Sequence, residues 1–293
     1  GAQTSARFWT KITEDWVMQF SGMLAYNYLI ALAPLALALL AIAGLILGSL
    51  SPETYQSFVN QLATAMPGGI GHSLIDGILR QLSKSAGLLL VIAVITGVFS
   101  GSRLFVAMEN CFAVIYRVSN RQAVPQNVVA LLMTLLFIIL APLTFTASTI
   151  AGTILRAIVP SGVQHNGIAV TAEGFITGGI AAFILFAAIY FVVPNRKVTW
   201  KTVWPGALFA AVLLSLYGVL FPIYQGLFLK NAGYGSVVGL AIVVLIFLYY
   251  IGLISLLGAE MNTWRVGLRP LGKKLPQLFL AEEQRSDSAA PSA

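Results

Sequence analysis

Apolar residues in this chain occur in six long blocks, which polar connections separate. A bilayer core about 30 Å thick needs roughly 20 helical residues, and the blocks reach that length. The second block reaches it only if its helix continues past Arg103. Lipid favours helix, since each backbone N–H must be satisfied within its own segment. The pattern predicts an all-α, polytopic membrane helix bundle with about six transmembrane helices, at residues 20–48, 86–116, 127–157, 174–193, 204–229 and 236–264.

The connection between the first two spans has a different pattern, which predicts an external amphipathic helical hairpin over residues 51–85. Ser51-Pro52-Glu53 is typical of a helix start, with an N-cap, a first-turn proline and an acidic residue. Apolar residues then recur at helical spacing on both sides of the break at Pro67-Gly68-Gly69. We interpret the hairpin as a connector that lies on the membrane surface; the alternative is a lid over the bundle.

The two ends of the chain are polar. Residues 269–293 are rich in Ser, Ala and charged residues, which predicts a disordered cytoplasmic tail after a single transmembrane domain over residues 1–268. The first fifteen residues contain no short apolar stretch that ends in a cleavage site, so we expect no signal peptide.

Composition agrees with a chain that is largely surrounded by lipid. The 293 residues are 58% hydrophobic and 9% charged, whereas a soluble domain carries about 25% charged residues. Mean hydropathy is +0.87. Cys111 is the only cysteine, which excludes an intrachain disulfide and a zinc site built from cysteines.

Basic residues gather in alternate connections, which predicts the orientation. Positive charge stays cytoplasmic, so both termini are expected inside the cell, in agreement with an even number of spans. Twelve basic residues lie on that side: Arg7, Lys11, Arg117, Arg121, Arg196, Lys197, Lys201, Arg265, Arg269, Lys273, Lys274 and Arg285. Four lie on the other side: Arg80, Lys84, Arg156 and Lys230. Orientation and anionic headgroups therefore account for the net charge of +7, and nucleic acid is not an expected partner.

Ionisable side chains within spans cost several kcal/mol each unless they are paired or hydrated, and three stand out here. They are Arg103, which lies deep, and Glu109 and Glu260, which are placed near the cytoplasmic ends. Arg103 and Asn110 are seven residues apart and share a helix face, from which Glu109 points away. We expect an Arg103–Glu260 pair inside the bundle with Asn110 nearby; the alternative is a pair that only locks helices together.

Other polar residues could line a cavity. Tyr26 and Asn27 lie in the first span and Tyr234 at the entry to the sixth, and buried amides and phenols need partners in lipid. For Tyr234, as for Trp204 and Trp264, an anchoring role at the membrane interface is favoured. Close approach between helices is expected at three glycines: Gly206, Gly235 and Gly258.

Signs of catalysis are lacking. The only histidines, His72 and His165, fall in predicted external connections, so a histidine-based metal or nuclease centre lacks its parts. The sequence has neither a phosphate-binding loop nor a Gly-x-Ser-x-Gly elbow. We therefore expect no enzyme, no cofactor and no metal.

An ordered set of short motifs resembles the YihY/BrkB family of bacterial membrane proteins over about residues 15 to 268. The motifs are Leu24-Ala-Tyr-Asn-Tyr28 with Ala33-Pro34, Arg103 with Glu109-Asn110, Trp204-Pro-Gly-Ala207, Tyr234-Gly-Ser236 and Gly258-Ala-Glu-Met-Asn262. The resemblance implies six helices in the bacterial cytoplasmic (inner) membrane. Members have been labelled ribonuclease BN, virulence factor and transporter, and the ribonuclease label is regarded as a misassignment. Some relatives are linked to envelope lipid or lipopolysaccharide handling.

Residues and resemblance together favour a transporter or a flippase-like, lipid-handling protein of the bacterial envelope, with an anionic substrate. Arg103 would bind the anionic group and Glu260 would hold it in place or exchange with it. The expected partners are membrane lipids, such as anionic phospholipids or lipopolysaccharide precursors, and a homo-oligomer is an open alternative. The rival function is a membrane scaffold that docks envelope-assembly proteins and transports nothing.

Overall fold

The computed structural model describes residues 2–50, 52–65, 75, 88–158, 167–224, 237–268 and 270. This part of the chain is helical and contains no strand. In chain order its helices are α1 (Ala2–Glu14), α2 (Val17–Leu50), α3 (Pro52–Ala65), α5 (Leu88–Tyr116), α6 (Ala123–Ile158), α8 (Gly167–Val192), α9 (Trp200–Tyr224) and α10 (Val237–Arg265).

Six of these helices are long and apolar enough to cross a membrane. Their membrane-crossing parts are Val17–Ala43, Val94–Tyr116, Ala123–Thr144, Gly174–Val192, Trp200–Phe221 and Ala241–Arg265. The predicted all-α bundle of six spans is confirmed, and most helix ends fall within a few residues of the predicted limits. Two prolines lie inside helices without ending them: Pro34 in α2 and Pro142 in α6.

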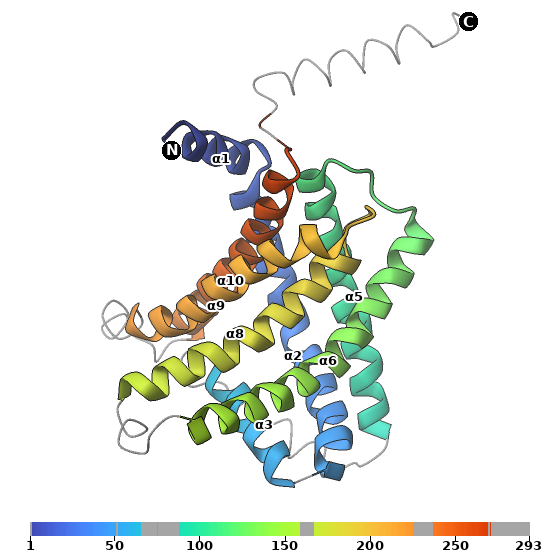
Figure 1. Cartoon of the computed structure of the whole chain (residues 1–293). Coiled ribbons are helices and arrows are strands. Elements are labelled where there is room, and N and C mark those ends of the chain that lie inside the picture. Colours follow the sequence, from blue (N-terminus) through green and yellow to red (C-terminus); the bar gives the residue numbers. More distant parts are fainter. Residues whose placement is uncertain are drawn as a thin grey trace, which may run out of the picture.

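The six spanning helices pack in a ring, in the order α2, α5, α6, α8, α9, α10 and back to α2. Contacts of α2 with α6 and of α5 with α10 fill its interior. Figure 1 shows α1 at one end of this bundle and α3 at the other. We call these the α1 end and the α3 end.

Helix α1 is an element that the sequence analysis did not predict. Its side chains divide between two faces, since Lys11 and Ile12 are buried whereas Trp9 is exposed. The chain turns into α2 at Trp16, whose φ of 57° lies in the left-handed region that residues other than glycine rarely adopt. This turn brings α1 against the end of α10.

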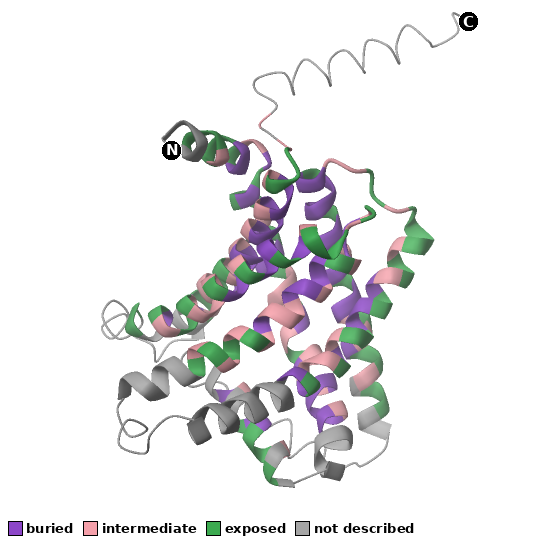
Figure 2. Cartoon of the chain, in the orientation of Figure 1, coloured by how far each residue is buried: buried purple, intermediate pink, exposed green. Residues whose placement is uncertain are grey.

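Tight packing is concentrated toward the α1 end, where Figure 2 shows most of the buried residues. Small residues permit it. A Cβ added to Gly206 of α9 would overlap the carbonyl oxygen of Gly258 in α10, and one added to Gly258 would overlap the hydroxyl of Tyr190. The expected close approach is therefore confirmed at Gly206 and Gly258, while Gly235 lies outside the described residues.

The first arm of the predicted hairpin is present as α3, which packs Phe58, Val59 and Ala63 against Leu40 and Ala43 of α2. Apart from Ile75, its second arm lies outside the described residues. The tail beyond residue 270 is also outside them. The connector and lid roles and the disordered tail therefore remain predictions.

Candidate functional site

A buried cluster of charges joins α1, the α1–α2 turn and α10. The Lys11 ammonium donates to Asp15 Oδ2 at 2.5 Å and to Glu260 Oε2. Arg117, just after α5, lies 3.9 Å from the other oxygen of Asp15. Lys11 and Glu260 are both fully buried. Two cations thus face two carboxylates, so the cluster is neutral as a whole.

The partner of Glu260 differs from the one that the sequence suggested. Glu260 is bound by Lys11, whereas Arg103 is exposed on α5 and places its guanidinium over the Phe99 ring, 5.2 Å from the centroid. The expected Arg103–Glu260 pair is wrong. The reason is directional: Leu104, Phe105 and Met108 are among the α5 residues that point inward, and Arg103 points away from them.

Sequence reasoning missed Lys11 as a functional candidate because it counted this residue only as a positive charge at the membrane surface. A signal was present. Lys11, Ile12 and Asp15 lie three, four and seven residues after Phe8, which places the four side chains on one helical face. A lysine and an aspartate on an otherwise apolar face indicate an ion pair that is covered by another element.

A second ion pair occupies the same end of the bundle. Glu109 Oε2 lies 3.1 Å from Arg121 Nη1, and Glu109 Oε1 accepts a hydrogen bond from the Arg121 backbone. Arg121 also donates to the carbonyl oxygens of Val192, Val193 and Pro194, where α8 ends. Val192 is the last residue of α8, and carbonyls at a helix C-terminus lack a partner within the helix. Glu109 therefore positions Arg121, which caps α8, and this role explains why Glu109 is buried.

Asn262 makes further hydrogen bonds between helices. Its Oδ1 accepts a hydrogen bond from the backbone N–H of Gly206 at 2.8 Å, and its amide donates to the Tyr116 hydroxyl at 3.5 Å. Tyr190 donates to the Ser255 carbonyl oxygen at 2.7 Å. In the motif from Gly258 to Asn262, the glycine provides space, the glutamate an ion pair and the asparagine a hydrogen bond to α9. This motif holds the α1 end together.

Arg103 belongs to a different arrangement, on the outside of the bundle. Thr96, Ser100, Arg103 and Asn110 are spaced by four, three and seven residues, so they line one side of α5. Arg103 and Asn110 are both exposed, and Glu109 is buried, as the spacing predicted. Asn110 accepts a hydrogen bond from Gln126 of α6 at 3.0 Å. We call Thr96, Ser100, Arg103 and Asn110 the α5 stripe.

The other candidate residues do not join either arrangement. Tyr26 is 62% exposed on α2, and Asn27 donates its amide to the Met23 carbonyl oxygen of its own helix at 2.8 Å. Tyr234 lies outside the described residues. Among the residues that the structure describes, no three His, Cys, Asp or Glu side chains come together in a way that could hold a metal ion.

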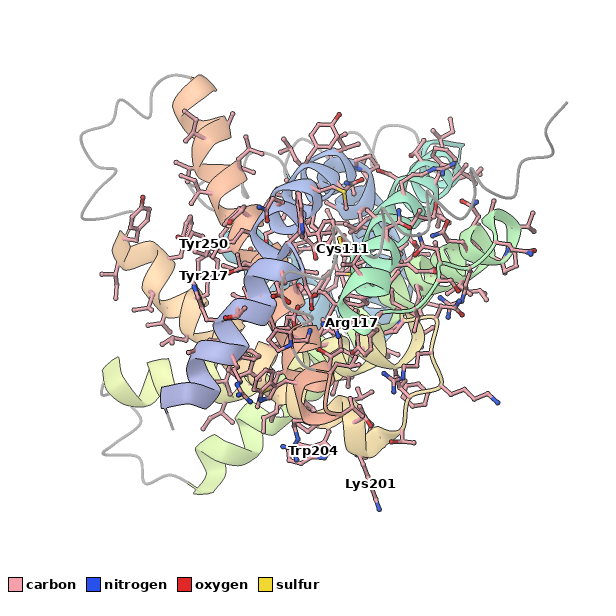
Figure 3. The ribbon with its side chains drawn as sticks, turned by 90° about the horizontal axis from the view of Figure 1, so that it is seen from above. Cys111, Arg117, Lys201, Trp204, Tyr217 and Tyr250 are labelled. Atoms are coloured by element: carbon pink, nitrogen blue, oxygen red, sulfur yellow. The ribbon has the colours of Figure 1, made fainter. Side chains whose placement is uncertain are left out.

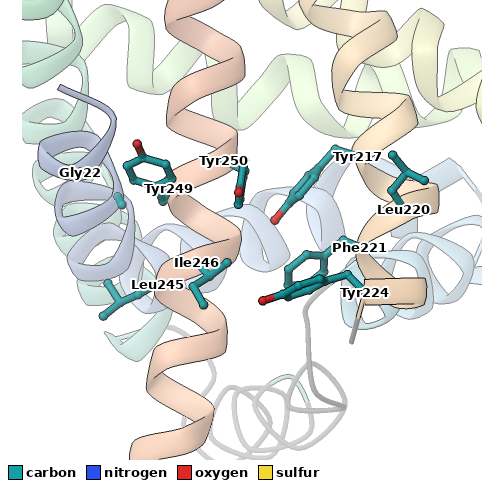
Figure 4. A pocket seen from close by; sticks show the side chains of 10 residues that line it. Gly22, Tyr217, Leu220, Phe221, Tyr224, Leu245, Ile246, Tyr249 and Tyr250 are labelled. Atoms are coloured by element: carbon teal, nitrogen blue, oxygen red, sulfur yellow. The ribbon is translucent and has the colours of Figure 1, made fainter. Parts of the chain in front are cut away.

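A pocket of about 640 Å³ lies between α2, α9 and α10, as Figure 4 shows. Its lining residues are Gly22, Ala25, Tyr217, Leu220, Phe221, Tyr224, Leu245, Ile246, Tyr249 and Tyr250. Tyr217 and Tyr250 lie next to each other across the two helices, with ring centroids 5.5 Å apart (Figure 3). None of the lining residues is charged. We call this cavity the Tyr217 pocket.

Comparison with known proteins agrees with this arrangement of apolar helices. The family described as virulence factor BrkB matches residues 8–272, which is most of the chain. The chain belongs to this family. It is an integral membrane protein, and the predicted YihY/BrkB resemblance is confirmed.

Curated relatives of this BrkB family member carry two kinds of name. A Bacillus subtilis protein named YfkH and described as ribonuclease-like is 28% identical, over 87% of this chain and 91% of its own. UPF0761 membrane proteins from Stenotrophomonas maltophilia and Janthinobacterium are 25% and 26% identical, over 92% and 86% of this chain. The chain spans about three fifths of the length of these UPF0761 relatives. No solved structure matches it.

Proposed function

We propose that this protein handles lipids: it binds the headgroup of an anionic membrane lipid on the α5 stripe and carries it between the two sides of the bilayer. The observation that supports this proposal is the place of Arg103, a cation near the middle of a spanning helix that faces outward. Glu260, which the sequence analysis assigned to the substrate, is already engaged by Lys11 and has no part in the proposal.

The depth of Arg103 is the first step of the argument. It lies nine residues from Val94 and thirteen from Tyr116, the two limits of its span. At about 1.5 Å per residue, those distances are about 14 Å and 20 Å along the helix. A lipid-facing arginine at this depth costs about 2.5–3.5 kcal/mol on insertion scales, and an anion that accompanies it would offset that cost.

The chemistry of the α5 stripe is the second step. A guanidinium presents a rigid fork of N–H donors that matches a phosphate oxygen pair. Thr96 and Ser100 lie along the helix on the α3 side of Arg103, and Asn110 with Gln126 on the α1 side. A headgroup that moves along α5 would meet a polar group at every second turn or less, while its acyl chains remain in lipid.

Orientation is part of the proposal. The expected placement of most basic residues on one side of the membrane puts the α1 end in the cytoplasm, and both termini with it. The membrane is then the bacterial inner membrane. A reporter fused to either terminus should be active only if it works in the cytoplasm.

The test compares lipid transfer by wild-type protein and Arg103→Gln in phosphatidylcholine vesicles that contain fluorescent phosphatidylglycerol. Bleaching of the outer leaflet measures how fast the lipid crosses. We expect Arg103→Gln to slow this transfer by about tenfold or more, since a hydrogen bond to a charged group is worth about 1.5–3 kcal/mol. Native mass spectrometry should show phosphatidylglycerol retained by the wild type and lost from the variant.

The matched control is Arg196→Gln, which removes an exposed arginine from the connection between α8 and α9. It should transfer and retain lipid as the wild type does. Equal rates for the two variants would overturn the proposal. Retention of a second protein in place of lipid, lost with Arg103→Gln, would also overturn it and would favour the scaffold function.

A further inference from the structure

The Tyr217 pocket lies on a different side of the bundle from the α5 stripe, because α2 stands between α5 and α10 in the ring. Nine of its ten lining residues fall inside membrane-crossing segments, with Tyr224 just beyond the end of one. Its volume of about 640 Å³ is within the range of about 300–1,000 Å³ that is usual for ligand sites. The pocket is thus a ligand-sized space at membrane depth.

Its walls are aromatic and hold one another in place. Tyr217 stacks on Phe247, with ring centroids 5.6 Å apart, and contacts Phe221 at 5.2 Å. Phe221 in turn stacks on Tyr224 at 6.3 Å. The Tyr249 hydroxyl points to the Met18 sulfur of α2, 3.5 Å away. A wall of interlocked rings exists before any ligand arrives, which lowers the ordering cost of binding.

Gly22 of α2 also lines the pocket, and its lack of a side chain leaves space there. A Cβ added there would meet nothing within 4 Å. This differs from Gly206, Gly258 and Gly97, where an added Cβ would overlap a neighbouring helix. Close helix packing therefore does not explain the glycine at position 22, whereas room inside the pocket does.

The pocket opens sideways toward lipid. Leu220, Tyr224, Leu245 and Tyr250 of its lining are exposed on the outer surface of α9 and α10. At this depth the surrounding medium is hydrocarbon. A ligand that enters from there needs no polar partner, and the lining offers no charged side chain to a headgroup.

We infer that the Tyr217 pocket binds one acyl chain of a membrane phospholipid. The chain lies between the aromatic wall of α9 and α10 and the open surface at Gly22 and Ala25, and its headgroup stays outside the pocket. This site does not depend on lipid transfer along the α5 stripe, because it holds a hydrocarbon chain and contains no residue of the stripe.

The test uses wild-type protein reconstituted with a phospholipid that carries a diazirine near the end of one acyl chain. After irradiation, mass spectrometry of peptides maps the insertion sites. We expect label concentrated in residues 217–224 and 245–250. In Gly22→Leu the new side chain occupies part of the pocket and obstructs an acyl chain, so these two segments should lose much of their label.

Gly178→Leu is the matched control, because a Cβ at Gly178 of α8 also meets nothing within 4 Å and this residue lies outside the Tyr217 pocket. It should keep the label. Arg103→Gln should keep it too, even if transfer along α5 fails. Uniform labelling that Gly22→Leu does not change would overturn the inference. So would copurification of an isoprenoid lipid in place of phospholipid, or cross-linking of the pocket to a second copy of the chain.

Discussion

Glu260 and Arg103 are both charged side chains on apolar helices, yet their surroundings are opposite. Glu260 is fully buried and bound by a lysine from the first helix of the chain. Arg103 faces outward, and its guanidinium lies over the ring of Phe99 on the same helix. A charge that the fold satisfies contributes to structure. A charge that the fold leaves on the lipid-facing side of a helix is available to water, to headgroups or to a ligand.

The largest loss of stability should follow from removing one charge of the buried cluster around Lys11 and Glu260. Glu260→Ala leaves Lys11 buried with Asp15 alone, and loss of one partner of a buried ion pair costs about 3–5 kcal/mol. Unfolding in mixed micelles of increasing denaturing detergent would measure the loss. The double variant Lys11→Met with Glu260→Ala should be less destabilised than the sum of the two single variants. Additive effects would mean that the two side chains are not coupled.

A smaller change in the free energy of unfolding should distinguish the packed α1 end from the Tyr217 pocket. Gly206→Ala forces a methyl group against α10, and such overpacking costs about 1–3 kcal/mol. Gly22→Ala is its counterpart, with open space at the same atom, and should not lower the free energy of unfolding, since alanine is favoured over glycine in a helix by up to about 1 kcal/mol. The same detergent titration compares them. Equal destabilisation would show that α2 packs at Gly22 as tightly as α9 packs at Gly206.

The smallest effect on stability should come from Arg103, and with the opposite sign. Arg103→Leu removes a cation from the lipid face, which should raise the free energy of unfolding by up to about 1 kcal/mol. This is less than the insertion cost of about 2.5–3.5 kcal/mol, because the variant also loses the contact between the guanidinium and the Phe99 ring. Titration in lipid bicelles measures it. A loss comparable to that of Glu260→Ala would make Arg103 a structural residue and remove the contrast.

Periodicity alone accounted for much of this architecture. Block length predicted the six spans, and helical spacing correctly placed Arg103 and Asn110 on one face and Glu109 on another. It could not choose the partner of Glu260, because it offered Arg103 as the basic residue deepest in a span, whereas the actual partner lies 249 residues away in the chain.

Lys11 was missed as the partner of Glu260 also because its helix, α1, was not predicted. Residues 2–14 carry many polar side chains, and no helix was predicted there, although the buried face of this segment follows helical spacing. The Tyr217 pocket was beyond sequence reasoning for another reason. Tyr217 and Tyr250 belong to the sequences of two different spans, and only the packing of α9 beside α10 makes them a wall.

The contact between Lys11 and Glu260 also bears on how the protein is made. A ribosome adds about 5–20 residues per second, so Lys11 is synthesised about 12 to 50 s before the glutamate that binds it, 249 residues later. During that interval the lysine must stay at the water-exposed surface. The first helix can therefore dock only when the last helix has been inserted, and a truncated chain would display an undocked, basic N-terminal helix that marks it as unfinished.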